Sequence, residues 1–229
     1  MMREHLVFTL TATIGSMGDL AGHERRGTWT WPARSAVVGL LGAALGLRRE
    51  DDFAPLDRLV TAVAIFDDGA PLRDYHTVQT VPTAAAKHPQ SRPEAMAIAG
   101  RQVNTTITVR DYRTQPLYGV ALWGGDLAPL QTALHRPAFN LYLGRKACPL
   151  SAPVGARIVS AASPEDAMQS LALPKWRMGA QARMLASDEG PGDRIETRND
   201  RALDRRQWHF APRKVHMRQC RIAPADAVG

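Results

Sequence analysis

The chain has 229 residues, of which 45% are hydrophobic, so it is long and apolar enough to bury a substantial core. With 29 Lys and Arg against 22 Asp and Glu, its formal charge is +7, which favours an anionic partner such as nucleic acid. Two cysteines, Cys148 and Cys220, exclude a disulfide framework, and nothing resembles a signal peptide or a membrane span, so a reducing cytoplasm is the expected location.

The N-terminal part predicts a strand, a loop and a helix. Apolar alternation over residues 5–13 indicates a strand, and residues 14–31 form a glycine-punctuated loop. Within that loop, Trp29 and Trp31 are two positions apart, which fits packing on one strand face better than stacking on nucleic acid. The apolar run 36–47 predicts a helix with three embedded glycines, which suggest that something packs very close to its backbone.

The start of this helix is a candidate phosphate site. Ser35 is the predicted N-cap, and Arg34 precedes it. Both residues lie beside free N–H groups at the positive end of the helix, where an anion is stabilised. A solvent-facing cap and a salt-bridged arginine are the alternative.

The middle of the chain predicts two strand pairs and a long excursion. Residues 59–66 and 72–78 are expected to form a hairpin around the turn at 67–69. The second of these strands carries Arg73, Tyr75 and His76, which together offer a phosphate ligand, a stacking ring and an imidazole. Residues 79–104 depart from the sheet, and then come strands at 105–112 and 117–123 and a helix at 127–135.

The segment Tyr142–Leu150 combines a glycine, two adjacent cations and a proline. Gly144 allows a close backbone approach, Arg145 and Lys146 suit phosphate, and Pro149 restricts the exit. These features predict an anion-contacting loop, and a surface turn with solvated charges is the alternative.

The last quarter is basic, with 12 Lys or Arg and 6 Asp or Glu between residues 174 and 221. A helix is expected to start at Ser163, and paired strands with little helix beyond Pro174. The arginines there either contact an anionic partner or pair with interspersed acids such as Asp200 and Asp204. The element order fits an α+β sheet with helices on one face, and neither zinc spacing nor a P-loop is present, so no metal or cofactor is expected.

Four blocks of sequence carry a resemblance to a known family. Residues 32–47, 73–78, 120–123 and 142–150 come in the order seen in the Cas-five family of CRISPR-associated RAMP proteins, in its type I-E Cascade branch. The closing patterns Arg206-x-Trp-x-Phe and Arg213-x-Val resemble that family more loosely.

The resemblance implies a modified RNA-recognition-motif (ferredoxin-like) fold over residues 1–150, with a thumb-like β-hairpin insertion near 79–116. Residues 151–229 would add a helix and a basic β region packed on it as one structural unit. After the first strand the family usually has Gln-x-Trp-Gly, whereas this chain has Gly15-Ser16-Met17-Gly18-Asp19, so stacking by a ring is lost and Met17 would wedge against a base instead.

The function implied by the resemblance is a non-catalytic subunit that caps the 5′ handle of the guide RNA (crRNA) in a Cascade. Its partners would be that handle, the backbone subunit through the thumb, and the large PAM-reading subunit, with target DNA met only through the complex and no membrane. The expected RNA contacts are Met17, Arg34, Ser35, Arg73, His76, Arg110, Tyr142, Gly144, Arg145 and Lys146.

Two other functions stay open. The chain would be a metal-independent endoribonuclease, as some type I-C relatives are, if His76 served as general acid or base, Tyr75 as its partner and Lys146 as the stabiliser of the transition state. It would be a generic single-strand binder if it showed no preference for the handle sequence.

Overall fold

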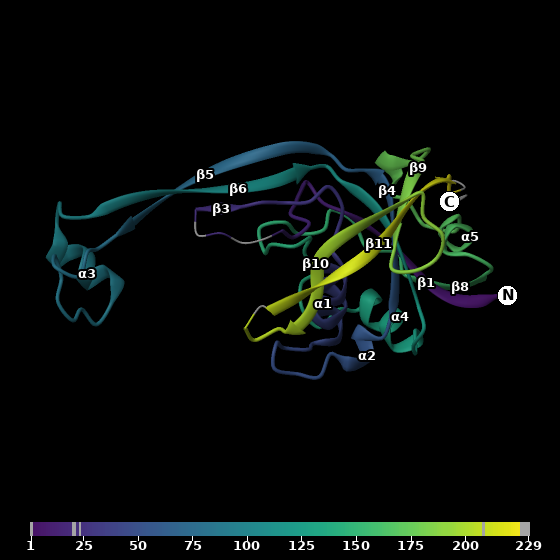
Figure 1. Ribbon diagram of the computed structural model, residues 1–229, viewed down its shortest axis with the longest axis horizontal. Coiled ribbons are helices and arrows are strands. Elements are labelled where there is room, and N and C mark those ends of the chain that lie inside the picture. The colour runs from purple at the N-terminus through teal and green to yellow at the C-terminus, as the bar shows by residue number, and fades with distance from the viewer. Residues whose placement is uncertain (1, 20–21, 23, 208, 225–229) are drawn as a thin grey trace.

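The computed structural model describes residues 2–19, 22, 24–207 and 209–224 and consists of a body with a long arm (Figure 1). The body is built on a seven-stranded sheet in the order β10-β11-β9-β4-β7-β1-β8, in which neighbouring strands are antiparallel. Its strands are β1 (Arg3–Thr11), β4 (Val60–Asp67), β7 (Leu117–Trp123), β8 (Arg157–Ala161), β9 (Ala182–Ser187), β10 (Arg194–Asp204) and β11 (His209–Ile222).

Helices cover both faces of this sheet. On one face, α1 (Arg34–Leu45) and α4 (Ala128–His135) pack on the alternate β1 residues Leu6, Phe8 and Leu10. On the other face, α5 (Pro164–Met168) packs with Val7 and its neighbours. Our expectation that helices lie on one face was therefore wrong, because the strands are apolar on both sides and the second side also needs cover.

The helix starts differ in how well the sequence predicted them. Ser163 caps α5 as expected, and its side chain accepts a hydrogen bond from the Asp166 backbone N–H. By contrast, α1 starts at Arg34 with Ala33 as its N-cap, so Ser35 lies inside the first turn and is not the cap. The close packing that the glycines of α1 suggested is real at Gly42, where a Cβ would lie 2.5 Å from the ring of Phe53.

The arm is a two-stranded ladder with a helix at its end (Figure 1). Strands β5 (Ala70–Thr80) and β6 (Asn104–Thr114) pair along their whole length, and α3 (Arg92–Ala99) lies at the tip. At the opposite end, the short strands β2 (Ile14–Gly15) and β3 (Arg25–Arg26) pair with β6. We call this end, where the arm meets the body, the arm root.

The predicted hairpin of residues 59–66 with 72–78 was wrong. Strand β4 pairs with β7 and β9 in the body, whereas β5 pairs with β6 in the arm. The chain leaves the main sheet at Gly69, whose φ is +71° and whose position would place a Cβ 2.1 Å from the Thr114 carbonyl oxygen. A glycine is required there because the backbone is left-handed and touches another strand.

The remaining elements are the short α2 (Ala54–Asp57) and a 3-10 turn, η1 (Lys175–Arg177). Beyond η1, strands predominate in the described C-terminal residues, as the sequence predicted, although Trp208 of the closing pattern lies outside the described residues. Within the described part of the chain, no helix combines the length and the apolar composition needed to cross a bilayer.

Candidate nucleic-acid interface at the arm root

The two strands of the arm present two faces. Because side chains alternate along a strand, the register places Leu72, Asp74 and His76 on one face with Thr108, Arg110 and Tyr112, and we call this the Tyr112 face. The other face carries Arg73, Tyr75 and Thr77 with Ile107, Val109 and Asp111, and we call it the Asp111 face.

The loop 142–149 is held closed by its own backbone. Leu143 N–H donates to the Cys148 carbonyl at 2.8 Å, and Cys148 N–H donates to the Arg145 carbonyl at 2.8 Å. Leu143 and Cys148 are buried, while Tyr142 is half-buried and forms a β-bridge with Pro149. The loop is therefore a rigid platform for the exposed residues between them.

Gly144 makes a close approach, but to the protein itself. Its φ is +84°, and a Cβ there would lie 1.7 Å from the Ser16 carbonyl oxygen. The expectation that this glycine admits a ligand was therefore wrong, because the neighbouring backbone already occupies the space that its missing side chain leaves.

Arg145 connects the loop to strands β6 and β3 at the arm root. Its guanidinium lies 4.6 Å from the ring of Tyr112 and donates to the Asp111 carbonyl at 3.2 Å. It also donates to the carbonyls of Arg26 at 3.0 Å and Gly27 at 3.4 Å. Carbonyl groups carry no formal charge, so the positive charge of Arg145 is held in place without being neutralised.

Three further cations surround Arg145. Lys146 follows it in the loop and is exposed, Arg26 is exposed on β3, and Arg110 is the register partner of Arg26 on β6. The Nε atom of Arg110 is buried and has no hydrogen-bond partner. Among the described residues none of these four cations contacts a carboxylate, and we call Arg26, Arg110, Arg145 and Lys146 the root cluster. Such a group can attract and hold phosphate.

On the Asp111 face, the Asp111 carboxylate binds two arginines. Its carboxylate accepts from Arg73 Nε at 2.8 Å and from Arg25 Nη2 at 2.8 Å. The hydrogen bond from Arg73, together with that from Arg25, lowers the pKa of Asp111 below its usual value. Arg73 is thus paired with an acid and does not share a face with His76, so the predicted set of hairpin contacts is divided between two faces.

His76 and Tyr75 also point to opposite faces. The Nε2 atom of His76 lies 2.6 Å from the Asp74 carboxylate, on the same face as Arg110. Tyr75 is 66% exposed and lies on the Asp111 face. The two side chains therefore do not converge on one point.

The predicted phosphate site at the start of α1 is occupied by acidic side chains of the protein. Asp200 accepts the N–H of Arg34 at 2.8 Å, and the Arg34 guanidinium contacts Asp188 at 3.1 Å. Arg213 donates to both oxygens of Asp200 and pairs with Asp188 as well. Arg34 is buried with its charge matched, and Ser35 follows it half-buried in the first turn, so the expectation of a phosphate here was wrong.

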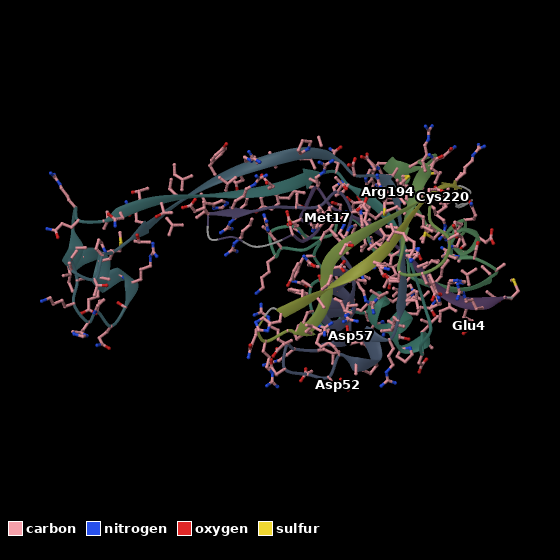
Figure 2. All side chains as sticks on the ribbon, in the orientation of Figure 1. Glu4, Met17, Asp52, Asp57, Arg194 and Cys220 are labelled. Atoms are coloured by element: carbon pink, nitrogen blue, oxygen red, sulfur yellow. The ribbon has the colours of Figure 1, made fainter. Side chains whose placement is uncertain are left out.

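Met17 is a core residue. Its side chain is fully buried beside the arm root (Figure 2), and its N–H donates to Thr28 Oγ1 at 2.7 Å. The expected wedge against a base was therefore wrong, since a thioether inside the core cannot reach a ligand. The packing role predicted for the tryptophans holds for Trp31, which is buried, but Trp29 is 37% exposed and neither residue lies in a strand. The Arg198 guanidinium contacts both rings, at 3.9 Å from Trp29 and 4.3 Å from Trp31.

The structure thus brings together some of the predicted contacts and separates others. Arg110, Arg145 and Lys146 meet at the arm root with Tyr142 and Gly144 in the same loop. By contrast, Met17 and Arg34 are buried, Ser35 is half-buried in α1, and Arg73 is paired with Asp111 on the other face of the arm. The sequence marked Arg25 and Arg26 as residues that could grip a nucleic acid, but the expected RNA contacts did not include them, and Asp111 was missed. A signal for Asp111 was present, because Arg-Asp-Tyr occurs at both 73–75 and 110–112, and antiparallel pairing of the two copies sets each arginine opposite an aspartate.

Comparison with known proteins places the chain in a family. The family model described as CRISPR-associated protein (Cas_Cas5) matches residues 5–216. The CRISPR system Cascade subunit CasD of Escherichia coli (strain K12) is 30% identical over 184 residues, which are 73% of this chain and 76% of that protein.

Two solved structures have the same fold. A chain of a CRISPR RNA-guided surveillance complex superposes with a TM-score of 0.72 at 20% identity and covers 98% of this chain and 95% of its own. A Cas protein crystal structure superposes with a TM-score of 0.63 at 25% identity, covering 96% and 97%. The chain therefore belongs to the Cas5 (Cas-five) family of CRISPR-associated proteins.

Proposed function

We propose that this protein is a non-catalytic crRNA-binding subunit of a type I-E-like Cascade and that its root cluster caps the 5′ handle of the guide RNA. The observation that carries the proposal is the grouping of Arg26, Arg110, Arg145 and Lys146 at the arm root without a carboxylate contact among the described residues. The similarity to a Cascade subunit, and to a chain of an RNA-guided surveillance complex, supports this assignment.

The order of elements supports an RNA-recognition-type fold. If the arm, the two-residue strands β2 and β3 and the short α2 are left out, the chain runs β1-α1-β4-β7-α4-β8, which is the order of a split βαβ fold. Strands β4, β7, β1 and β8 are neighbours in that spatial order, and β9, β11 and β10 extend the sheet. In this interpretation the arm is the thumb, inserted between the second and third strands of the fold.

The root cluster would bind the handle mainly through its phosphates. Arg145 is fixed by three carbonyls and the Tyr112 ring, so it loses little freedom on binding. Lys146 is exposed beside it and supplies a second point charge. His76, further along the Tyr112 face, would add a hydrogen bond to a base or a phosphate.

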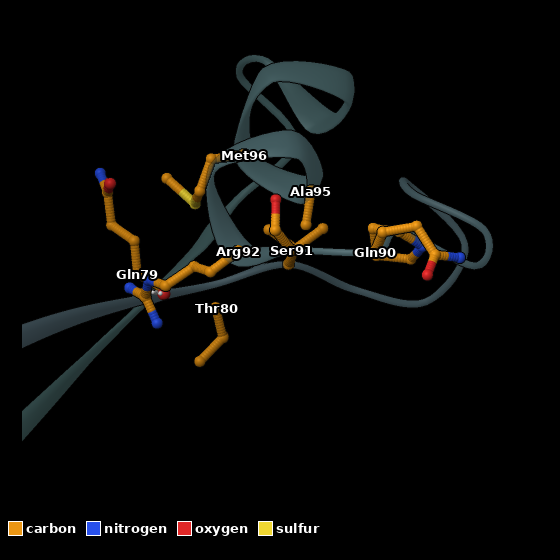
Figure 3. A pocket seen from close by; sticks show the side chains of 9 residues that line it. Gln79, Thr80, Gln90, Ser91, Arg92, Ala95 and Met96 are labelled. Atoms are coloured by element: carbon orange, nitrogen blue, oxygen red, sulfur yellow. Dashed lines mark hydrogen bonds between the residues drawn. The ribbon is translucent and has the colours of Figure 1, made fainter.

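The arm would bridge to the backbone subunit of the complex. Its tip is stiffened where Arg92 Nη2 donates to the Gln79 carbonyl at 2.8 Å, which ties α3 to the end of β5 (Figure 3). Lys87, Arg92 and Arg101 are exposed at this tip, so it can also approach an RNA that lies along the backbone. Other faces of the body would meet the large PAM-reading subunit.

The proposal includes no RNA cleavage. An endoribonuclease built on His76 and Tyr75 needs both groups within hydrogen-bond reach of one phosphate, and their positions on opposite faces of β5 argue against it. Incubation of the purified chain with repeat-derived RNA in EDTA should leave the RNA intact. Site-specific cleavage that His76→Ala abolishes would establish the enzyme instead.

Handle binding is tested by fluorescence anisotropy with a labelled handle RNA. The double variant Arg110→Ala/Lys146→Ala should weaken binding and lower the salt dependence by about 0.7 in log Kd per log salt for each phosphate that the variant no longer binds. A matched control is Arg136→Ala/Arg157→Ala, which removes the same charge from exposed positions after α4 and on β8.

Equal affinity of the two double variants would reject the root cluster as the site. A scrambled RNA of the same length tests the generic single-strand binder, which would bind both RNAs with equal affinity.

A further inference from the structure

The loop that connects α5 to β9 presents a tryptophan to solvent. Trp176 lies in η1 and is 63% exposed, and Met178 after it is 47% exposed. A tryptophan usually buries most of its ring, because the ring is among the largest apolar side-chain surfaces. We call residues 174–180 the Trp176 loop.

This exposure occurs in a well-anchored loop. Arg177 N–H donates to the Pro174 carbonyl at 2.7 Å, and Ala180 N–H donates to the Arg177 carbonyl at 3.2 Å. The Arg177 side chain is largely buried and pairs with Asp67, the last residue of β4. The Trp176 ring is therefore displayed by a turn with fixed geometry.

The anchor places the loop beside the arm root. Asp67 also accepts the N–H of Gly69 at 2.8 Å, at the point where the chain leaves the main sheet for the arm. The next residue, Asp68, accepts from Arg113 of β6 at 2.8 Å. Asp67 and Asp68 are thus each paired with an arginine, and the loop adjoins the end of the arm that carries the root cluster.

The segment of sequence around Trp176 is basic. No Asp or Glu occurs between Asp166 and Asp188, whereas Lys175, Arg177 and Arg183 all fall in that interval. Lys175 and Arg183 are exposed, and neither contacts a carboxylate within the described residues. An aromatic ring beside an unpaired cation such as Lys175 suits single-stranded nucleic acid, because any base can stack on the ring while its phosphate meets the cation.

We propose that the Trp176 loop is a second contact for single-stranded nucleic acid, distinct from the root cluster, in which Trp176 stacks on an unpaired base and Lys175 pairs with a phosphate. This contact goes beyond handle capping and does not depend on the handle sequence. Trp, Met and Arg are also enriched in protein–protein interfaces, but the unmatched positive charge favours a polyanion. A protein occupant is an outcome of the test.

The test uses the full chain with fluorescein-labelled oligo-dT and oligo-U of about 16 nucleotides, the upper end of common single-strand site sizes. Trp176→Ala should weaken binding about ten-fold, whereas Trp176→Phe should keep most of the affinity because a ring still stacks. Lys175→Ala should lower the salt dependence by about 0.7, as for one phosphate contact. Circular dichroism should be unchanged, since both side chains are exposed.

Comparing oligo-dT with oligo-U tests whether the site prefers DNA or RNA. A weaker affinity for one alone would assign the site to DNA or to RNA, and a weaker affinity for both would indicate recognition without regard to the sugar. Ultraviolet crosslinking of 4-thiouridine RNA should place the crosslink in the peptide that contains Trp176.

Unchanged affinity of Trp176→Ala for both oligonucleotides would overturn the proposal, even if the variant assembled poorly with a protein partner. Because the handle assay uses the root-cluster variants, failure here and failure of handle capping give different results.

Discussion

Replacing Arg145 by lysine separates the positioning role of this side chain from its charge. A lysine keeps the charge but cannot reach three carbonyls and lie over a ring at the same time. The hydrogen bonds that a lysine cannot keep run to the carbonyls of Asp111 at 3.2 Å, Arg26 at 3.0 Å and Gly27 at 3.4 Å. For this half-buried group each contributes about 0.5 kcal/mol, and the interaction with Tyr112 contributes about 0.5 kcal/mol. The free energy of unfolding should therefore fall by about 2 kcal/mol.

Urea unfolding measures that change directly, and the Tm should fall by about 4–8 °C for a chain of this size. The salt dependence of handle binding should stay unchanged in Arg145→Lys and should decrease by about 0.7 in Arg145→Ala. If Arg145→Lys is as stable as the parent, the carbonyl contacts do not hold the arm root together. If Arg145→Ala keeps the full salt dependence, its charge does not meet a phosphate.

Three further changes test other parts of the structure. The hydrogen bond from Arg73 lowers the pKa of Asp111. Asp111 therefore stabilises the fold above about pH 4, and this contribution disappears as the pH falls further. Asp111→Asn should remove that part of the acid sensitivity, which pH-dependent unfolding measures. Burial lowers the pKa of His5, so the free energy of unfolding should decrease as the pH falls below about 6.5. In His5→Phe, denaturation curves measured over a series of pH values should show a weaker dependence of this free energy on pH. Gly144→Ala should cost at least about 2 kcal/mol in unfolding measurements, because its φ is +84° and the new Cβ would meet the Ser16 carbonyl; a Tm equal to that of the parent would contradict the tight approach.

In the arm, local sequence patterns predicted which residues form strands but not which strands pair. Alternating apolar residues predicted strands at 59–66, 72–78, 105–112 and 117–123, and all four are strands. The nearest-neighbour assumption then paired the first two, because short turns commonly join hairpins. The structure pairs β5 with β6 across α3, and the opposed charges of the two Arg-Asp-Tyr copies were the available signal for that register.

In the basic C-terminal quarter, the sequence predicted the excess of positive charge but not which arginines are paired inside the protein. Composition predicted an anionic partner or internal pairing, and Arg213 with Asp200 realises the second alternative. Arg198 is enclosed by two tryptophans and pairs with Glu196. Net charge therefore overstated how much of this region is available to a ligand.

By itself, the sequence determined the α+β class, most of the strands and the family, because these depend on local periodicity and on motifs in a fixed order. It also singled out the loop of Arg145 and Lys146. Only the tertiary structure decided which cations remain unpaired, because an ion pair is set by distance in space. Arg34 pairs with Asp188, which lies 154 positions further along the chain, whereas Arg110 lies between Asp74 and Arg26 in the strand register and forms no ion pair among the described residues. That difference in partners makes the first arginine part of the core and the second a candidate ligand for RNA.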